Sequence, residues 1–413
     1  MNLNKFHNVV ILIYCIFNIA GFALILEDNQ LIGDFSNTPF NSQNINNLLL
    51  CLILVCISYV GVLKYIDRSF NIEKKHFANV KFINSIGLLI AVLQVLFFIW
   101  FYLTGTRSAA SVQTDGSIYA IFFAIFEPDL FFVIYYMTFR GDKFVKANLL
   151  IYIISNLVRG WTGFIYLVLY MEIYYYLINN KLSIKQYLMS FLSLVIVVVV
   201  FPFMLIFKLF LREGLSDGYS ISYFWYSIVR TVDGFNGVSV NDVFINYLIN
   251  PVVGRFQVVA SAFGIQEYVN EINDAFDQTL IFPYWAEGIH GVIWNRLFGN
   301  VRTEVMPLEL GKLISSNSEL LLGWTPNPSL IGWLFISGVE FPVFLLFIFF
   351  NIYVAVKLTQ KLSPTPNGKN MVWFVALTLL MPGWLMSFNK FIFALLILNL
   401  IKVFYVQKKN NSI

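Results

Sequence analysis

The residues of this sequence best suited to chemistry are its arginines. Seven of the nine fall on the outer side of the topology that the apolar runs predict. An arginine keeps its charge, and its transfer across the membrane opposes the usual enrichment of positive residues on the cytoplasmic side. Because the planar guanidinium matches the oxygens of a phosphate, we predict an outward-facing site that binds anions. The outward arginines are Arg107, Arg159, Arg212, Arg230, Arg255, Arg296 and Arg302.

Arg159 has the most specific setting of the seven. It lies in an Arg-Gly turn between two short apolar arms, 147–158 and 161–178. Short arms leave the guanidinium below the membrane surface, where a charge is costly unless it faces a polar cavity or a partner. A helix that starts near Trp161 would also direct its N-terminal amides toward an anion. We therefore predict that Arg159 binds a phosphate group.

Arg255 follows Gly254 at the start of an amphipathic stretch, which again indicates an arginine near a helix N-terminus. Arg212 and Arg230 are similar but less specific, and we predict that they support the same site. The alternative for each arginine is a contact with lipid phosphates at the membrane surface. That alternative stays open above all for Arg107, Arg296 and Arg302.

Two carboxylates, Glu127 and Asp129, flank Pro128 in the middle of the apolar run 118–138. Carboxylates in hydrocarbon are functional by default, or they pair with a buried arginine. The proline frees a backbone carbonyl and is expected to kink the helix. Catalysis by these two side chains and a structural ion pair with Arg159 remain equal interpretations.

His290 is the one histidine on the predicted outer side, and it lies three residues after Glu287. Its titration near neutral pH suits a general base that activates a hydroxyl. A lone histidine is more often structural, and Glu287 or another outward carboxylate competes with it for the same role. The sequence therefore predicts a base at His290 or Glu287 without deciding between them.

Aromatic residues accompany the outer arginines. Aromatic faces stack on the C–H face of a pyranose ring, so a ligand with both phosphate and sugar would fit; the alternative is an aromatic belt at the membrane surface. No DxD, HExxH or Cys/His cluster appears on the outer side, so neither a metal nor another cofactor is predicted. The predicted sugar-binding residues are Tyr284, Trp285, Trp225 and Trp324.

The composition places these residues in a membrane protein. The chain has 413 residues, of which 58% are hydrophobic and only 12% are charged, about half the charged fraction of a soluble domain. No basic cluster is interleaved with stacking aromatics, so nucleic acid is not an expected partner. Apolar runs long enough to span a bilayer predict about ten transmembrane helices, counting two short arms. These lie near 8–26, 46–66, 83–103, 118–138, 147–158, 161–178, 187–209, 330–353, 371–387 and 388–407.

The lysines fix the predicted orientation. Fifteen of the 18 fall in even-numbered connections, at the helix ends beside them, or near the chain ends. The enrichment of positive residues on the cytoplasmic side therefore predicts that both termini are cytoplasmic. A short outer hairpin is expected at Asn389-Lys390, where the run 371–387 stops.

One long connection, 210–329, dominates the outer side. Its roughly 120 residues are too many for an unstructured loop in a compact protein. We predict several short helices at the membrane surface, because Val252, Phe256, Val259 and Phe263 recur at helical spacing. The chain then divides into an N-terminal bundle of seven spans (1–209), the large loop (210–329) and a C-terminal bundle of three spans (330–413).

Several of these features together resemble the bacterial O-antigen polymerase family (Wzy type). They are the ten or so spans, the two short arms that meet at an Arg-Gly turn (156–163), and the single dominant outer loop with its arginines. The exit from that loop is a further likeness, with Asn317-Ser318-Glu319, then the run from Thr325 to Gly332, then Gly338. Family members often have ten residues between an arginine and a glycine (RX10G), which places the two 11 positions apart, whereas Arg255 and Gly264 are nine positions apart here.

The resemblance implies an all-α polytopic glycosyltransferase of GT-C-like fold in the bacterial inner membrane, with a large helical periplasmic loop. It would transfer a polymer from undecaprenyl pyrophosphate to another undecaprenyl-linked oligosaccharide repeat unit. The arginines would hold the donor pyrophosphate and stabilise its growing charge. Membrane lipids and a protein that regulates chain length are then expected partners, and no metal is needed.

Three rival functions remain open. An O-antigen ligase shares this architecture but transfers polymer to lipid A core, and it is expected to depend more on a histidine in its large loop. A lipid-linked oligosaccharide flippase would place charges along a central cavity rather than in outer loops. A scaffold of envelope assembly would not need an arginine at membrane depth.

Overall fold

A computed structural model gives the structure of the protein and describes residues 3–36, 38–73, 80–104, 118–159, 161, 163–179, 250–298, 303, 305–314 and 326–410. These residues are helical throughout, apart from turns and a single antiparallel bridge between Gln30 and Pro39. Six segments among the described residues are long and apolar enough to cross a bilayer, so the described part of the chain is that of an all-α membrane protein, as its composition predicts. They are Leu3–Asp28, Ser42–Ser69, Val80–Thr104, Tyr119–Thr138, Gly338–Leu362 and Leu385–Tyr405.

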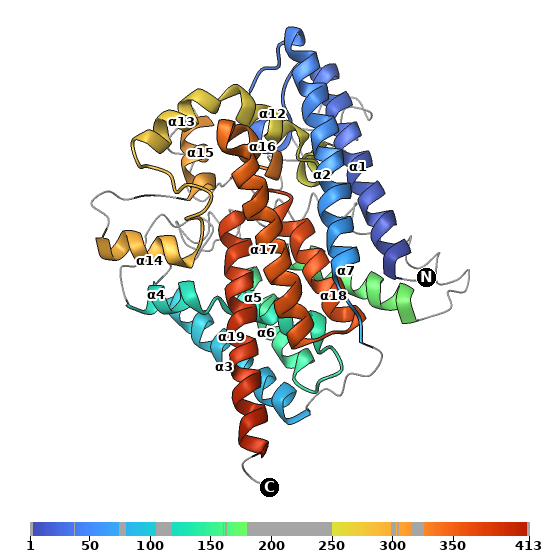
Figure 1. Ribbon diagram of the computed structural model, residues 1–413, viewed down its shortest axis with the longest axis vertical. Helices are drawn as coiled ribbons and strands as arrows, with labels where there is room; N and C mark the ends of the chain where they lie inside the picture. Colours follow the sequence, from blue (N-terminus) through green and yellow to red (C-terminus); the bar gives the residue numbers. More distant parts are fainter. Residues whose placement is uncertain are drawn as a thin grey trace, which may run out of the picture.

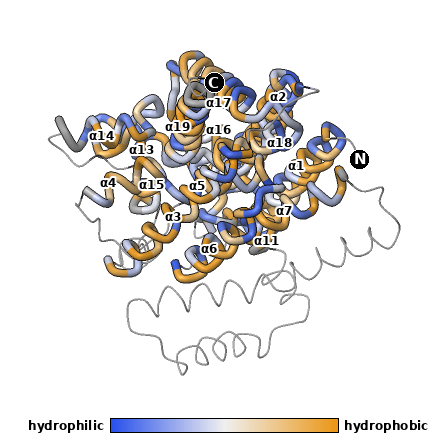
Figure 2. The backbone as a smooth tube through the Cα atoms, turned by 90° about the horizontal axis from the view of Figure 1, so that it is seen from below, coloured by the Kyte–Doolittle hydropathy of each residue, from blue (hydrophilic) through white to orange (hydrophobic). Residues whose placement is uncertain are grey.

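The long helices expose apolar side chains on their outer faces. Helix α1 (Leu3–Asp28), α2 (Ile45–Ser69) and α3 (Val80–Thr104) follow one another at the start of the chain (Figure 1). Leu12 of α1 is 59% exposed and Ile57 of α2 is 61% exposed. Such a surface suits hydrocarbon, in which every backbone N–H and C=O must be bonded within the helix. Figure 2 shows the apolar stretches of these helices.

The run 118–138 forms one spanning segment, but it consists of two helices rather than one continuous helix. Helix α4 (Ile118–Ile125) ends before Glu127, and α5 (Pro128–Thr138) begins directly after it. Proline lacks an N–H and its fixed φ suits the first position of a helix, so Pro128 starts α5 instead of bending a longer helix.

The two short arms are confirmed as separate helices. They are α6 (Val145–Val158) and α7 (Gly163–Asn179), and Arg159 lies directly after α6. The short length of α6 therefore decides where along the bundle Arg159 is held.

The C-terminal boundaries differ from the predicted ones. The predicted span 330–353 is wrong, because α16 (Leu330–Ile336) is a separate short helix and α17 (Phe341–Leu362) is the long one. Gly338 lies between the two helices with φ of +49°. A turn of this kind cannot be recognised from the hydropathy of the sequence. The spanning segment therefore begins at Gly338 and runs to Leu362.

The end of the chain differs in a second respect. Helix α18 (Pro366–Val375) continues as a π-helical stretch (Ala376–Leu380), and α19 (Leu385–Asn410) follows a turn at residues 381–384. The hairpin predicted at Asn389-Lys390 is therefore wrong, since both residues lie inside α19. Their side chains instead face neighbouring elements of the protein.

The described part of the long connection is helical, as predicted. Its amphipathic stretch is divided into two helices, α11 (Asn250–Phe256) and α12 (Val259–Glu267). Buried Asn18 of α1 accepts hydrogen bonds from the backbone N–H groups of Val258 and Val259 at 2.8 and 3.1 Å, and so fixes the start of α12 on the bundle. The helices are α11 (Asn250–Phe256), α12 (Val259–Glu267), α13 (Val269–Asp277), α14 (Ile289–Phe298) and α15 (Met306–Ile314).

The first and last helices of the chain share one core. Helices α17 and α18 pack on α2, and α18 and α19 pack on α5 (Figure 1). Helix α3 runs parallel to α6, because the Asn148 amide near the start of α6 donates to the Gly87 carbonyl near the start of α3. It runs antiparallel to α5, because the Phe82 ring at the start of α3 contacts the Phe139 ring at the end of α5. The Phe82 and Tyr405 rings, 5.9 Å apart, bring the start of α3 to the end of α19.

Lysines gather at the end of the bundle where α1 begins. Lys369 is only 4% exposed and donates to Asn4 Oδ1 at 3.0 Å and to the Asp67 carbonyl at 2.7 Å. Asp67 Oδ1 also lies 2.7 Å from His7 Nδ1. This buried polar cluster joins α1, α2 and α18, so Lys369 ties helices together rather than lying in a loop.

Some predictions fall outside the described residues. The span 187–209 and the first part of the long connection, 210–249, are among them. So are Arg107, Arg212, Arg230, Arg302, Trp225 and Trp324, and the side chain of Arg296.

Candidate functional site

The two carboxylates predicted at membrane depth lie at the break between α4 and α5. Glu127 occupies the break with φ of −67° and ψ of 101°, so it belongs to neither helix. Asp129 lies in the first turn of α5, where the helix dipole favours a negative charge. The break therefore brings both carboxylates to the N-terminal end of α5.

Arg159 pairs with one of these carboxylates. It is 3% exposed, and its Nη2 lies 2.6 Å from Asp129 Oδ2. Its Nε donates to the Ser155 carbonyl at 3.2 Å. The guanidinium carbon lies 5.0 and 5.4 Å from the ring centroids of Phe97 and Phe101 on α3, within cation–π range. The ion pair that the sequence left as an open alternative is thus present.

These contacts leave one part of the Arg159 guanidinium available. Nη1 has no hydrogen-bond partner within the part of the chain that the structure describes. A guanidinium can donate five hydrogen bonds, so the pair with Asp129 does not exhaust it. Arg159 is therefore held in position while it keeps donors for an additional acceptor.

Lys390 of α19 pairs with the other carboxylate. Its Nζ lies 2.8 Å from Glu127 Oε2, and both side chains are partly exposed, at 16% and 29%. The pair joins α19 to the α4–α5 break. We call Glu127, Asp129, Arg159 and Lys390 the charged cluster.

Glu287 lies where the long connection meets α19. It is 1% exposed, and its Oε1 accepts the backbone N–H of Met306 at 2.7 Å, at the start of α15. The N–H of Met386, in the first turn of α19, also bonds to it. Burial raises the pKa of Glu287 to about 7, although these two N–H groups act in the opposite direction. A buried carboxylate that binds two helix N-termini favours a structural role over that of a base.

His290, in contrast, is exposed and held in one orientation. Its Nε2 lies 2.8 Å from the carbonyl oxygen of Trp285. Since a carbonyl can only accept, Nε2 carries the proton, and Nδ1 of the neutral ring is left as an acceptor. A Cβ added to Gly288 would lie 2.6 Å from His290 Cε1 and 2.7 Å from Nδ1, so only glycine leaves room for this ring.

One residue of α19 connects the histidine loop to the charged cluster. Asn389 Nδ2 donates to the Glu287 carbonyl, and the next residue is Lys390. Helix α14, which begins beside His290, lies near α4 in both views (Figure 1, Figure 2). The structure therefore joins His290, Glu287, Glu127, Asp129 and Arg159 into one region.

The two predicted sugar-binding aromatics that the structure describes differ in their exposure. Tyr284 is 8% exposed and packs edge-on against the rings of Phe344 and Phe347 in α17. Trp285 is 58% exposed, beside the histidine. Trp161, which the sequence did not select for sugar binding, is 47% exposed and lies 5.3 Å from the Arg159 guanidinium.

Arg255 lies apart from this region in the fold. It is exposed in the last turn of the seven-residue helix α11, which packs on α1. Its predicted place near a helix N-terminus is therefore wrong, because the amphipathic stretch is divided at Gln257 and Val258. The backbone carbonyls at the C-terminal end of α11 carry a partial negative charge, which stabilises the positive charge of Arg255.

Besides Trp161, sequence reasoning missed Lys390, Asn389 and Gly288. A lysine inside an apolar run signals a charge at membrane depth, by the same argument that selected Arg159. The adjacency of Asn389 and Lys390 instead indicated a turn. No sequence pattern identifies Gly288 as part of the site, because its contribution is the space that it leaves for the His290 ring.

Within the described residues, no group of three or more histidine, cysteine, aspartate or glutamate side chains is arranged to hold a metal ion.

The comparisons leave the family of this protein undetermined. Compared with known proteins, the chain matches no protein-family model, no curated protein and no solved structure.

Proposed function

We propose that this protein polymerises lipid-pyrophosphate-linked oligosaccharide repeat units by glycosyl transfer at the outer face of a membrane. The observation that carries the proposal is the connection between the charged cluster and His290. A cation with unused donors and a side chain with an unused acceptor lie in one region, on elements that border the membrane. The resemblance to O-antigen polymerases remains a prediction and supplies the substrate class.

The proposed reaction uses these groups as follows. The acceptor sugar hydroxyl attacks the anomeric carbon of the donor, and the bond from that carbon to the pyrophosphate oxygen breaks. Nδ1 of His290 takes the hydroxyl proton, and undecaprenyl pyrophosphate leaves. The free donors of Arg159 and the ammonium group of Lys390 stabilise the charge that grows on the leaving pyrophosphate. Trp161 and Trp285 offer faces to the sugars.

The ion pairs support this assignment because they hold the cations ready. Asp129 and Glu127 keep Arg159 and Lys390 ordered in an apolar part of the protein before a substrate arrives. Groups that are already in place require no reorganisation during the reaction. Arg212 and Arg230 remain proposed supports, and Arg255 a proposed ligand for a more exposed part of the donor.

The distribution of lysines supports the orientation. Lys64, Lys361, Lys369 and Lys402 lie at the end of the bundle where α1 begins, and positive residues favour the cytoplasmic side. We therefore infer that both termini are cytoplasmic and that the opposite end, with α11 to α16, faces outward. In a bacterium this outer face is periplasmic, and the membrane is the inner one.

An O-antigen ligase is the second candidate. The exposure of His290 and its free Nδ1 favour it, because a ligase is expected to depend on a histidine in its large loop. The two enzymes differ in what accumulates when the protein is lost. A polymerase leaves single repeat units on the acceptor, whereas a ligase leaves complete polymer that is not attached.

The deciding experiment is the banding of surface polysaccharide from a strain that lacks the gene. We expect the ladder to disappear with one repeat unit retained. Gene copies with Arg159→Ala or His290→Ala should not restore the ladder, although each protein still inserts. Arg140→Ala is a matched control, because Arg140 pairs with Glu172 near the opposite end of α5.

Other outcomes identify the rivals or reject the proposal. Unattached polymer in the deletion strain would assign the ligase reaction. Repeat units retained on the cytoplasmic side would assign a flippase. An unchanged ladder in the deletion strain would exclude all three functions.

A further inference from the structure

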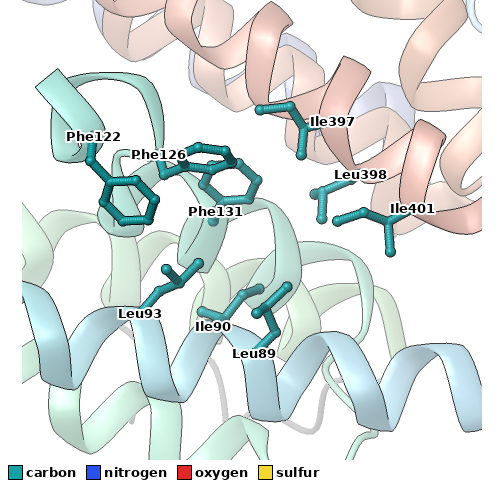
Figure 3. Close-up of a pocket in the computed structure, with 9 residues that line it drawn as sticks. All are labelled: Leu89, Ile90, Leu93, Phe122, Phe126, Phe131, Ile397, Leu398 and Ile401. Atoms are coloured by element: carbon teal, nitrogen blue, oxygen red, sulfur yellow. The ribbon is translucent and has the colours of Figure 1, made fainter.

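An apolar crevice of about 170 Å³ lies between α3, the α4–α5 break and α19 (Figure 3). Every side chain that lines it is aliphatic or aromatic. Leu89 and Phe122 in its wall are 43% and 40% exposed, so the crevice opens on the surface of the bundle. All three walls belong to segments long and apolar enough to cross a membrane, so the surroundings of this opening are hydrocarbon.

The charged cluster lies at one end of this crevice. Phe126 in the wall directly precedes Glu127, and Ile397 lies two helical turns, about 10 Å, from Lys390 along α19. On the third wall, Leu93 of α3 is one turn from Phe97, whose ring lies under the Arg159 guanidinium. All three walls thus lead from apolar side chains to the charged cluster in the same direction.

Beyond the opposite end, α3 and α19 are in direct contact through two aromatic rings. Phe82 at the start of α3 and Tyr405 near the end of α19 have ring centroids 5.9 Å apart. The crevice therefore lies along α3 and α19 between this aromatic contact and the charged cluster. An occupant needs an apolar chain within the membrane and an anionic group at its end.

We propose that this crevice holds the part of a polyprenyl chain next to its phosphate, with that phosphate at Arg159 and Lys390. The proposal rests on the proposed function and names the place where its lipid-linked substrate enters the protein. Arg159 and Lys390 lie at one end of the apolar crevice, whereas Lys402, which follows Ile401 at the other end, donates to the carbonyls of Lys361 and Leu362 on α17. The free cationic donors therefore orient a lipid with its anionic head toward Arg159.

The size and shape of the crevice favour a branched isoprene unit. Its volume is similar to that of an engineered cavity of roughly 150 Å³ that binds benzene. The aromatic wall from Phe122, Phe126 and Phe131 faces aliphatic side chains of α3 and α19 (Figure 3). A branched, unsaturated unit contacts both walls at once, whereas a thin straight chain would leave gaps and lose dispersion contacts.

The test is photolabelling of the full-length protein in phospholipid nanodiscs. The probe is undecaprenyl phosphate with a diazirine on an isoprene unit near the phosphate. We expect label on the α3, α4–α5 and α19 peptides that line the crevice. Unlabelled undecaprenyl phosphate should compete for it, and phosphatidylglycerol should not.

Filling the crevice should remove the label. Ile397→Trp on α19 and Leu93→Trp on α3 each place a large ring in the proposed chain path, so each should abolish labelling there. Leu400→Trp is the matched control, because Leu400 lies on the same helix, is 52% exposed and does not line the crevice. Two variants on different walls guard against the failure of one of them to fold.

The inference and the proposed function fail in different ways. Label confined to other helices, or competition by phosphatidylglycerol, overturns the crevice assignment, even where the deletion strain has lost its polymer ladder. Label at the crevice in a strain whose ladder does not need the protein keeps the lipid site and rejects the polymerase. Label that survives both tryptophan variants in folded protein also overturns the assignment.

Discussion

Arg159 Nη2 lies 2.6 Å from Asp129 Oδ2, and the two residues reach this contact from α6 and α5 at the membrane-spanning part of the protein. A buried ion pair is weak evidence for stability, since a well-packed apolar pair of similar volume is often as stable. We therefore expect this ion pair to serve a function other than stability. The unused donors of Arg159 can bind a further acceptor, which is such a function.

Replacing one partner of this pair should differ from replacing both. Arg159→Ala leaves Asp129 without its cation, and breaking such a pair costs about 3–5 kcal/mol. The double variant Arg159→Met with Asp129→Leu should recover most of that stability, because neither charge remains. The measurements are the melting temperature of the purified protein and the polymer ladder in complemented cells.

The ladder then separates structure from chemistry. If Arg159 binds the donor pyrophosphate, the double variant should melt near the wild-type temperature but make no polymer. A double variant that restores both stability and full-length polymer would show that Arg159 only holds α6 to α5.

The position of the His290 ring can be tested without changing the histidine. Gly288→Ala places a Cβ 2.6 Å from His290 Cε1, so the ring must move from its contact with the Trp285 carbonyl. If Nδ1 is the base, polymer synthesis should fall by roughly 10²–10⁴-fold, the usual contribution of a positioned general base. Incorporation of repeat units by purified protein in lipid vesicles gives the rate.

Gly141→Ala is the control for this change, because nothing lies within 4 Å of a Cβ added there. It should leave the rate unaltered. A Gly288→Ala protein with the wild-type rate would remove His290 from the reaction, since its ring cannot keep its present place.

Glu287 should make the junction of the long connection and α19 sensitive to pH. Burial raises its pKa from 4.5 when exposed to about 7 in the folded protein, so the folded state binds the proton more tightly than the unfolded state. The stability that this provides is fully present below about pH 4.5 and is lost as pH rises through 7, amounting to about 3 kcal/mol. Hydrogen exchange of peptides from 283–310, corrected for intrinsic rates, should therefore show more opening at pH 8 than at pH 5.

Two variants locate the source of this pH dependence. Glu287→Gln cannot titrate and should flatten the profile, whereas Glu271→Gln, at an exposed position of α13, should leave it unchanged. A profile that is the same in wild type and Glu287→Gln would assign the effect to another group.

The sequence predicted the parts of the structure that depend on local pattern. The apolar runs identified the long helices, and the Arg-Gly turn divided α6 from α7 correctly. Each of these signals lies within about twenty consecutive residues. The Arg159–Asp129 pair joins residues 30 apart, but it was one of the open interpretations, because a charge at membrane depth needs a partner.

The contacts between distant segments could not be predicted in this way. Lys390 meets Glu127 across 263 residues, and the free Nδ1 of His290 depends on a backbone carbonyl. The start of α17 was misplaced because the apolar run continues through Gly338, whose positive φ leaves no trace in hydropathy. The three walls of the crevice likewise come together only in the fold.

The exit from the long connection depends on one such long-range contact, between Ser329 and Gly383. The Ser329 N–H donates to the Pro382 carbonyl at 2.8 Å, and the Trp333 indole N–H donates to the Gly383 carbonyl at 2.9 Å. Gly383 has φ of +85°, and a Cβ there would lie 2.6 Å from the Ser329 carbonyl oxygen. This turn directly precedes α19, so it sets the position of Lys390.

Gly383→Ala should therefore destabilise the protein and disturb the charged cluster together. The left-handed backbone costs a residue with a side chain about 1–2 kcal/mol, and the collision with Ser329 adds to that cost. Gly61→Ala is the control, because nothing meets a Cβ there and alanine favours its helix. We expect a lower melting temperature and less polymer for Gly383→Ala, and neither loss for Gly61→Ala. If Gly383→Ala melts like the wild type, the close contact between this turn and Ser329 does not exist in the membrane.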